Sequence, residues 1–306
     1  MRLLSLALLL SACGGPRPPA PEIDAARAFE YARIQVGFGP RIPGTEGHAR
    51  MAAWLDSLLR TKADSVVVQS WSHRTREGTE IPQRNFLARF NPGATIRLLF
   101  LAHWDTRPRA DAGTSADTAA PVPGANDGAS GVAVLLAMAD ALEKAPPAVG
   151  VDLLFVDGED YGSFEHLDSA DGSDVLIGSR YFARNPPPGP APRFAVVLDM
   201  VGDRSPMFRK EAYSTTAAPE VVERVWEVAA RMGHGAVFVA ESGGYLSDDH
   251  LPLQQAGIRA IDVIDFDYGP NNAYWHTTED TLDKLSQDTL KLVGDVMMGV
   301  IRTYRE

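Results

Sequence analysis

The chain has little cysteine and no excess of positive charge. Its one cysteine in 306 residues, Cys13, allows neither an internal disulfide nor a zinc site built on several thiolates. There are 40 acidic side chains against 29 lysines and arginines, and the formal net charge is -11. Such a charge repels phosphates, so we expect no nucleic-acid partner. The apolar run near the amino terminus, residues 3–10, is far shorter than the roughly 20 residues that cross a bilayer.

Several catalytic motifs are absent as well. The sequence contains no Gly-x-Ser-x-Gly nucleophile elbow, no Walker loop, and no Gly-x-Gly-x-x-Gly after its first expected strand. The cysteine lies outside the expected fold and cannot serve there as a nucleophile. Chemistry based on a nucleophilic side chain or on a nucleotide is therefore a poor fit. Metal-assisted attack at a carbonyl is the better one.

The amino terminus resembles a bacterial lipoprotein signal. Arg2 supplies a positive charge, residues 3–10 are apolar, and Leu10-Ser-Ala-Cys13 forms a cleavage site of small residues. The alternative is an ordinary secretory signal with a coincidental cysteine. We expect residues 1–12 to be removed, Cys13 to carry the lipid, and residues 13–22, rich in proline and glycine, to form a flexible tether. This places residues 23–306, one folded domain, at the periplasmic face of a membrane in the bacterial envelope.

Strand and helix patterns alternate through residues 23–306. Nearly unbroken apolar runs, typical of strands buried on both faces, occupy residues 96–102, 151–156 and 194–198. Shorter strands are expected at 66–71, 85–90, 237–240 and 258–264, and helices at 23–36, 46–62, 132–142, 179–184, 220–232 and 280–304. No long interior linker or repeat occurs. The pattern predicts one α/β domain with a twisted, mixed and mostly parallel sheet, flanked by helices on both faces.

Polar residues end these strands or occupy the loops after them. They are His103, Asp127, Glu159, Asp160, Asp199, Asp248 and His276. Open α/β sheets bind ligands at the carboxyl ends of their strands. Each residue alone has an ordinary structural interpretation, and Asp127 in particular could cap the following helix. Together they indicate a site, and histidines with carboxylates and no thiolate suit zinc.

Five ordered motifs resemble those of the zinc aminopeptidase and glutaminyl cyclase superfamily. They are His103-Trp-Asp105, Gly124-Ala-Asn-Asp127, Asp157-Gly-Glu-Asp160, Leu198-Asp-Met-Val-Gly202 and Trp275-His-Thr277. Gly39-Pro-Arg41 and Asn85-Phe-Leu-Ala88 are similar to further family motifs. The resemblance extends from about Arg27 to the end, and it implies a zinc aminopeptidase-like catalytic domain.

The two branches of the superfamily imply different metal sites. In glutaminyl cyclases one zinc is held by the residues that match Asp127, Asp160 and His276, while those matching Glu159, Asp199 and Asp248 form a carboxylate network. In aminopeptidases two zincs are bound. His103 and Asp199 would then be additional ligands, Asp127 would bridge the metals, and Glu159 would be the general base for a metal-bound water.

Two positions favour the cyclase branch. Aminopeptidases tend to carry serine where this chain has Asp248, and an additional carboxylate suits a site in which shared protons replace a second metal. Trp275, beside a zinc ligand, would form a flat wall for a glutamine side chain, although it could also be a core residue. One departure concerns the segment 162–166, which lacks the pattern of animal cyclases, so their pocket residues cannot be transferred.

The sequence therefore predicts a zinc-dependent glutaminyl-peptide cyclotransferase. It would convert the N-terminal glutamine of peptides or proteins to pyroglutamate and release ammonia, with Glu159 as the base and Asp199 and Asp248 in its proton network. We expect a monomer that contacts the membrane through its lipid anchor. The alternatives are a two-zinc aminopeptidase and a catalytically inactive lipoprotein that presents a binding surface; retention of Glu159 argues against the last.

Overall fold

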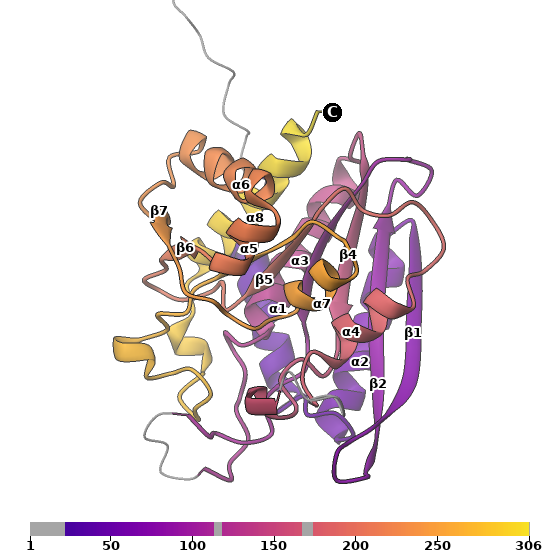
Figure 1. Ribbon diagram of the computed structural model, residues 1–306, viewed down its shortest axis with the longest axis vertical. Coiled ribbons are helices and arrows are strands. Elements are labelled where there is room, and N and C mark those ends of the chain that lie inside the picture. The colour runs from indigo at the N-terminus through magenta and orange to yellow at the C-terminus, as the bar shows by residue number, and fades with distance from the viewer. Residues whose placement is uncertain (1–21, 113–117, 167–173, 306) are drawn as a thin grey trace, which may run out of the picture.

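A six-stranded sheet between two layers of helices dominates the computed structural model, which describes residues 22–112, 118–166 and 174–305 (Figure 1). The strands are β1 (Ser65–Arg74), β2 (Glu80–Phe90), β3 (Arg97–His103), β4 (Gly150–Val156), β5 (Ala195–Asp199) and β8 (Ala260–Ile264). Their spatial order is β1-β2-β4-β3-β5-β8. β2 pairs antiparallel with β1 and β4, and all other neighbours pair parallel. The expected mixed, mostly parallel sheet is confirmed.

Each face of the sheet has its own apolar core. Phe100 of β3 packs in the larger core, whereas its neighbours Leu99 and Leu101 pack in the smaller one. The larger core contains residues of α1 (Ala25–Gly37), α2 (Glu46–Lys62), α3 (Ala129–Lys144), α6 (Pro219–Arg231) and α8 (Gln287–Thr303). On the other face lie α4 (Ile177–Arg184) and α7 (His250–Gln255), and α5 (Ala212–Ala217) packs beside α7 and β8. Burial on both faces explains the unbroken apolar runs of β3, β4 and β5.

The start of α3 is held against the end of β5. A Cβ atom at Gly131 would lie only 2.1 Å from the Leu198 carbonyl oxygen, and one at Gly128 would lie 2.4 Å from Nε2 of His103. Only glycine permits this approach at both positions. The two glycines that follow Asp127 therefore bring it to the same sheet edge as His103 and Asp199.

The carboxyl-terminal helix begins later than expected. We predicted a helix from residue 280, but α8 begins at Gln287, where Ser286 accepts a hydrogen bond from the Thr289 amide. A short 3-10 turn, η3 (Leu282–Lys284), precedes it. Asp280 precedes this turn, and its carboxylate points inward, where it accepts hydrogen bonds from the amides of Asn126 and Asp127.

Other elements are small. β6 (Phe208–Lys210), which we did not expect, pairs parallel with β7 (Phe238–Ser242), a strand expected at residues 237–240. The 3-10 turns η1 (Phe164–His166) and η2 (Pro270–Asn272) lie in the loops that follow β4 and β8.

The predicted lipidation site, Cys13, and the signal segment lie outside the described residues. The described chain starts at Glu22, whose amide and that of Ile23 donate to one carboxylate oxygen of Asp295 in α8. Glu22 also pairs with Arg302 near the end of the same helix. Among the described helices none is long and apolar enough to cross a membrane.

Candidate metal centre and active site

The seven polar residues expected at the strand ends meet at one edge of the sheet. His103 and Asp199 are the last residues of β3 and β5, Glu159 and Asp160 follow β4, and Asp127 precedes α3. All seven are buried, with Asp199 the most exposed at 8%. Asp127 is not a helix cap, because Gly128 occupies that position and α3 has no side-chain cap.

Asp127, Asp160 and His276 form the first potential metal site. One ligand atom from each lies within 4.8 Å of the others. Nε2 of His276 is 3.2 Å from Oδ1 of Asp160 and 3.5 Å from Oδ2 of Asp127. The second oxygen of Asp160 is buried without a hydrogen-bond partner among the described residues. Two carboxylates, one of which has a buried oxygen without a hydrogen-bond partner, and an imidazole fit a zinc ion.

The electrostatics of this group favour a cation. Burial and the charge of Asp160 raise the pKa of Asp127. Burial also acts to raise the pKa of Asp160, but His276 and Arg107 outweigh it and hold that pKa at about 2. Asp160 is therefore an anion at neutral pH, while Asp127 ionises with difficulty until a positive charge is placed beside it.

His103 forms a second group with Asp127 and Asp199. Nε2 of His103 lies 3.1 Å from Oδ1 of Asp127 and 3.3 Å from Oδ1 of Asp199. Burial acts to lower the pKa of His103, but the hydrogen bonds that its imidazole donates to Asp105, Asp127 and Asp199 raise it well above the usual value. This geometry suits either a second metal ion or a protonated imidazole that neutralises the same carboxylates.

Glu159 lies beside the second group and directly precedes Asp160 of the first. Its Oε2 is 4.0 Å from Nδ1 of His103. The amides of Glu159 and Asp160 donate to the two oxygens of Asp105, at 3.1 and 3.2 Å, which fixes the backbone of the acidic pair. Burial, followed by the charges of Asp160 and Asp248, raises the pKa of Glu159 well above its usual range. A carboxylate in such surroundings is suited to taking up a proton.

Asp248 extends the acidic cluster. It is 3% exposed, its Oδ2 has no partner among the described residues, and burial raises its pKa. Burial raises the pKa of Asp199 as well. Protons are the natural means of relieving repulsion among buried acids.

A cavity of about 190 Å³ opens onto these groups. Its polar lining includes Glu159, Asp199 and Asp248. Its apolar lining consists of Phe164, Met200, Tyr245, Leu246, Ile264, Phe266 and Trp275. The ring of Trp275 stacks on His276 at 3.9 Å with a tilt of 22°. Phe164 contributes an aromatic wall from the segment 162–166, which the sequence comparison had left without a role.

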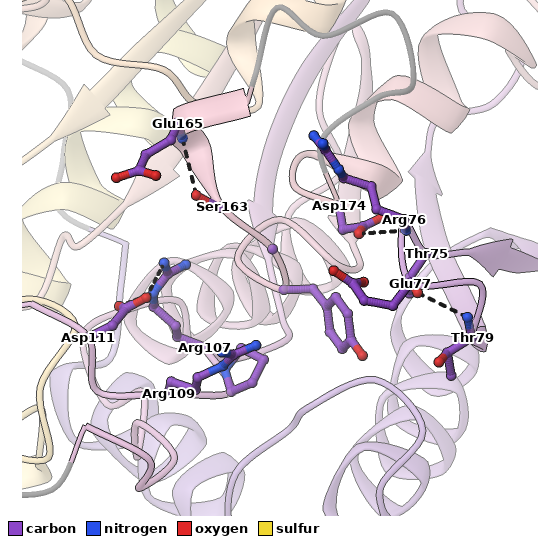
Figure 2. A pocket seen from close by; sticks show the side chains of 13 residues that line it. Thr75, Arg76, Glu77, Thr79, Arg107, Arg109, Asp111, Ser163, Glu165 and Asp174 are labelled. Carbon is purple, nitrogen blue, oxygen red and sulfur yellow. Dashed lines mark hydrogen bonds and ion pairs between the residues drawn. The ribbon is translucent and has the colours of Figure 1, made fainter.

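A larger cavity, about 820 Å³, lies elsewhere and is lined mainly by polar side chains (Figure 2). Arg107 separates it from the metal group, because its Nη1 donates to Oδ1 of Asp160 at 2.7 Å. The same guanidinium donates two hydrogen bonds to Asp111, the pair joined by the dashed line in Figure 2. Oδ1 of Asp111 is in turn 3.8 Å from Nδ1 of His276.

Sequence reasoning did not identify several supporting residues. Arg107 contacts Asp160, and Asp105 holds the backbone of Glu159 and Asp160. Asp280 accepts hydrogen bonds from the amides of Asn126 and Asp127 at 2.8 and 3.2 Å. Asp105 lies within a quoted motif and could have been recognised there. Arg107 and Asp280 carry no local signal, since a charged residue in a loop is usually exposed.

A buried group of histidine and aspartate side chains that could hold a metal ion, a buried carboxylate beside them and a small cavity are the features of a metal-dependent enzyme. The chain belongs to peptidase family M28, whose model matches residues 85–301. Zinc fits both this family and the donor set of the site.

Solved structures extend the likeness over almost the whole chain. A glutaminyl cyclase from Bacteroides thetaiotaomicron is 36% identical with a TM-score of 0.88, covering 93% of this chain and 99% of the other. A glutaminyl cyclase from Tannerella forsythia is 37% identical with a TM-score of 0.87, covering 93% and 100%. A leucine aminopeptidase precursor from Bacteroides thetaiotaomicron is 36% identical with a TM-score of 0.88, covering 94% and 100%.

Proposed function

We infer that the protein is a zinc-dependent glutaminyl-peptide cyclotransferase. The observation that carries this inference is Asp248, a buried carboxylate that faces the same cavity as Glu159 and Asp199. A second metal would neutralise the cluster without it, whereas a proton network requires an additional acid. The similar bacterial structures described as glutaminyl cyclases support the same assignment.

The cavity suits one small residue. Its volume of about 190 Å³ equals the share of about six water molecules in the liquid. The acids and metal ligands form its buried floor, and Trp275 forms a flat apolar wall. A glutamine side chain can lay its methylene groups against that wall and present its amide to the floor.

Cyclisation requires one proton to be moved between two nitrogens of the same substrate. We propose that one zinc is held by Asp127, Asp160 and His276; when bound, it polarises the amide carbonyl as a Lewis acid. The α-amine nitrogen forms a bond to the side-chain amide carbon, and the bond from that carbon to the amide nitrogen breaks. Glu159 takes a proton from the amine and returns it to the leaving nitrogen, which departs as ammonia.

The other residues orient the substrate and stabilise the charges that develop on it. Asp199 and Asp248 hold the shared protons that keep Glu159 available as a base. Nucleophile and electrophile belong to one molecule, so the enzyme mainly supplies orientation and electrostatic stabilisation.

The two-zinc aminopeptidase is a second candidate because His103, Asp127 and Asp199 are also arranged as a metal group. Incubation with a Gln-initiated peptide and mass spectrometry separates the two. Loss of ammonia with the chain length unchanged is expected, and an otherwise identical Ala-initiated peptide should remain intact. Release of free amino acids from either peptide would instead establish the aminopeptidase.

We also propose that the mature protein is a monomeric lipoprotein anchored through Cys13 at the periplasmic face of a bacterial membrane. Arg2, the apolar residues 3–10 and the Leu10–Cys13 cleavage pattern support this proposal. Its substrates would be the N-termini of peptides or proteins in the envelope.

A further inference from the structure

Large apolar side chains that remain exposed are concentrated at the mouth of the active-site cavity. In the described residues they are Met207, Tyr213, Tyr245 and Phe266, with Tyr245 the most exposed at 70%. Tyr245 and Phe266 line the cavity itself. The ring of Tyr213 meets that of Tyr245 at 4.8 Å, and the Met207 amide donates to Asp265, the residue before Phe266. We call these four residues the apolar rim.

The direction of the substrate determines what meets the apolar rim. In the proposed function the glutamine side chain reaches the floor, where Glu159, Asp199 and Asp248 are each at most 8% exposed. The cavity has room for one residue, so the peptide bond that follows the glutamine must point to the mouth. The side chain of the second substrate residue is therefore the group that lies beside Tyr245 and Phe266.

The rim is held in place by the fold. Glu211 is 1% exposed, and its Oε1 accepts the amide of Tyr213 at 2.8 Å and that of Leu246, the residue after Tyr245, at 3.2 Å. One carboxylate thus fixes the backbone on both sides of the tyrosine pair. Phe266 is supported by Trp275, whose ring it meets edge-on at 5.0 Å. A preformed aromatic surface loses little conformational entropy when it binds a side chain.

The basic residue beside the rim is already paired. Arg209 forms ion pairs with Glu241 and Asp267. The exposed area offered by the rim is thus apolar and aromatic. It suits aromatic or large aliphatic side chains, which gain both from burial and from ring contacts.

We propose that the apolar rim binds the side chain of the second substrate residue and makes the enzyme prefer peptides in which an aromatic or large aliphatic residue follows the N-terminal glutamine. This inference rests on the proposed cyclase function. Tyr245 is the residue that determines this preference, because it is the most exposed and lies on the cavity wall.

The test compares kcat/KM for matched peptides that begin Gln-Phe, Gln-Leu and Gln-Gly, followed by ammonia release. The wild type should prefer Gln-Phe to Gln-Gly by about fivefold to tenfold, the size of one good aromatic contact. Tyr245→Ala should reduce that ratio to about twofold or less, mainly through KM, because uniform binding is lost. Tyr245→Phe should keep the ratio. Tyr181→Ala, which removes a tyrosine that stacks on Trp71 rather than on the rim, should leave the ratio unchanged.

Zinc content and far-UV circular dichroism establish that each variant is folded. Equal kcat/KM for Gln-Phe and Gln-Gly in the wild type would overturn the inference and leave the cyclase assignment intact. So would a ratio unchanged in folded Tyr245→Ala, which would point to a partner protein or a lipid surface as the ligand of the rim. No ammonia from any Gln peptide would overturn the cyclase function and this inference together.

Discussion

The active site has two halves built from the same residue types. In the first, His276 lies between Asp160 and Asp127, at 3.2 and 3.5 Å; in the second, His103 lies between Asp127 and Asp199, at 3.1 and 3.3 Å. Geometry alone therefore does not distinguish a metal site from a proton site. The neighbours of the two halves differ, however.

In the first half, Arg107 and His276 outweigh burial and hold the pKa of Asp160 at about 2. That carboxylate is ionised in advance and has one buried oxygen without a partner. In the second half, burial raises the pKa of Asp199, and it also raises that of Asp248, which lines the same cavity and which we count with this half. Without a bound metal, Asp160 of the first half is thus ionised, whereas Asp199 and Asp248 tend to keep their protons. This difference supports the proposed single zinc in the first half.

Removing a ligand from the first half should have the largest effect. His276→Ala or Asp160→Ala should abolish both zinc binding and cyclisation. Either change leaves only two of the three protein ligands that a catalytic zinc site requires. Elemental analysis and ammonia release check the two outcomes. His103→Ala is the control and should retain one zinc per chain. Two tightly bound zincs, one of them dependent on His103, would make both halves metal sites.

Replacing Glu159, the proposed base, should have the next largest effect. Glu159→Gln keeps the approximate shape of the side chain but cannot accept the amine proton. We expect zinc to be retained and kcat to fall by about 10²-fold or more, the contribution typical of general acid–base catalysis. A variant with full zinc and near wild-type kcat would assign the proton transfer to another group.

Asp248→Asn tests the second half directly. It should leave zinc bound but slow cyclisation by about tenfold or more, because the neutral amide breaks the shared-proton network. The measurement is the rate on Gln-peptides and on aminoacyl substrates, in the wild type and the variant. An aminopeptidase with a second cation in this half should tolerate the change. Near wild-type cyclisation by the variant would contradict the proton network.

Asp265 provides a contrast from the same edge of the sheet but outside both halves. Burial raises its pKa to about 7, although the amides of Met207 and Asp267 donate to it. The pKa of Asp265 in the folded state is above its value of about 3.9 in the unfolded chain. Its contribution to stability is therefore fully present below about pH 3.9 and is lost as the pH rises through about 7. Compared with Asp265→Asn, the wild type should lose at most about 1.4 kcal/mol of unfolding free energy per pH unit between about pH 4 and 7.

Denaturant midpoints measured across this range check the slope. A constant difference between the two proteins would mean that Asp265 ionises normally. The loss of cyclisation in Asp265→Asn should be smaller than in Asp248→Asn, since Asp265 does not line the cavity.

Cys13→Ala should have the smallest effect on catalysis, but it should abolish membrane anchoring. It removes the thiol that would carry the lipid, so the protein should remain unprocessed or be released from the membrane, with kcat/KM of the purified domain unchanged. Membrane fractionation and mass analysis of the mature start provide the test. A wild-type protein that is soluble and begins elsewhere without modification would refute the anchor.

Local patterns in the sequence sufficed for the sheet and for the residues at its edge. Apolar runs mark the central strands because burial on both faces acts on each residue independently. The polar residue that ends each run, such as His103 or Asp199, then lies at the carboxyl edge without further information. The quoted motifs carried the family resemblance, which implies the proposed ligand set and base.

Contacts between distant segments were decided only by the tertiary structure. Arg107 reaches Asp160 across 53 positions, and Asp280 reaches the Asp127 amide across 153. Phe164 and Tyr245 face one cavity although they lie in separate loops. Hydrophobic periodicity records how one segment meets the core, but it does not record which loops meet one another beyond the sheet edge. The partners of the ligands and the apolar rim therefore follow from the folded chain alone.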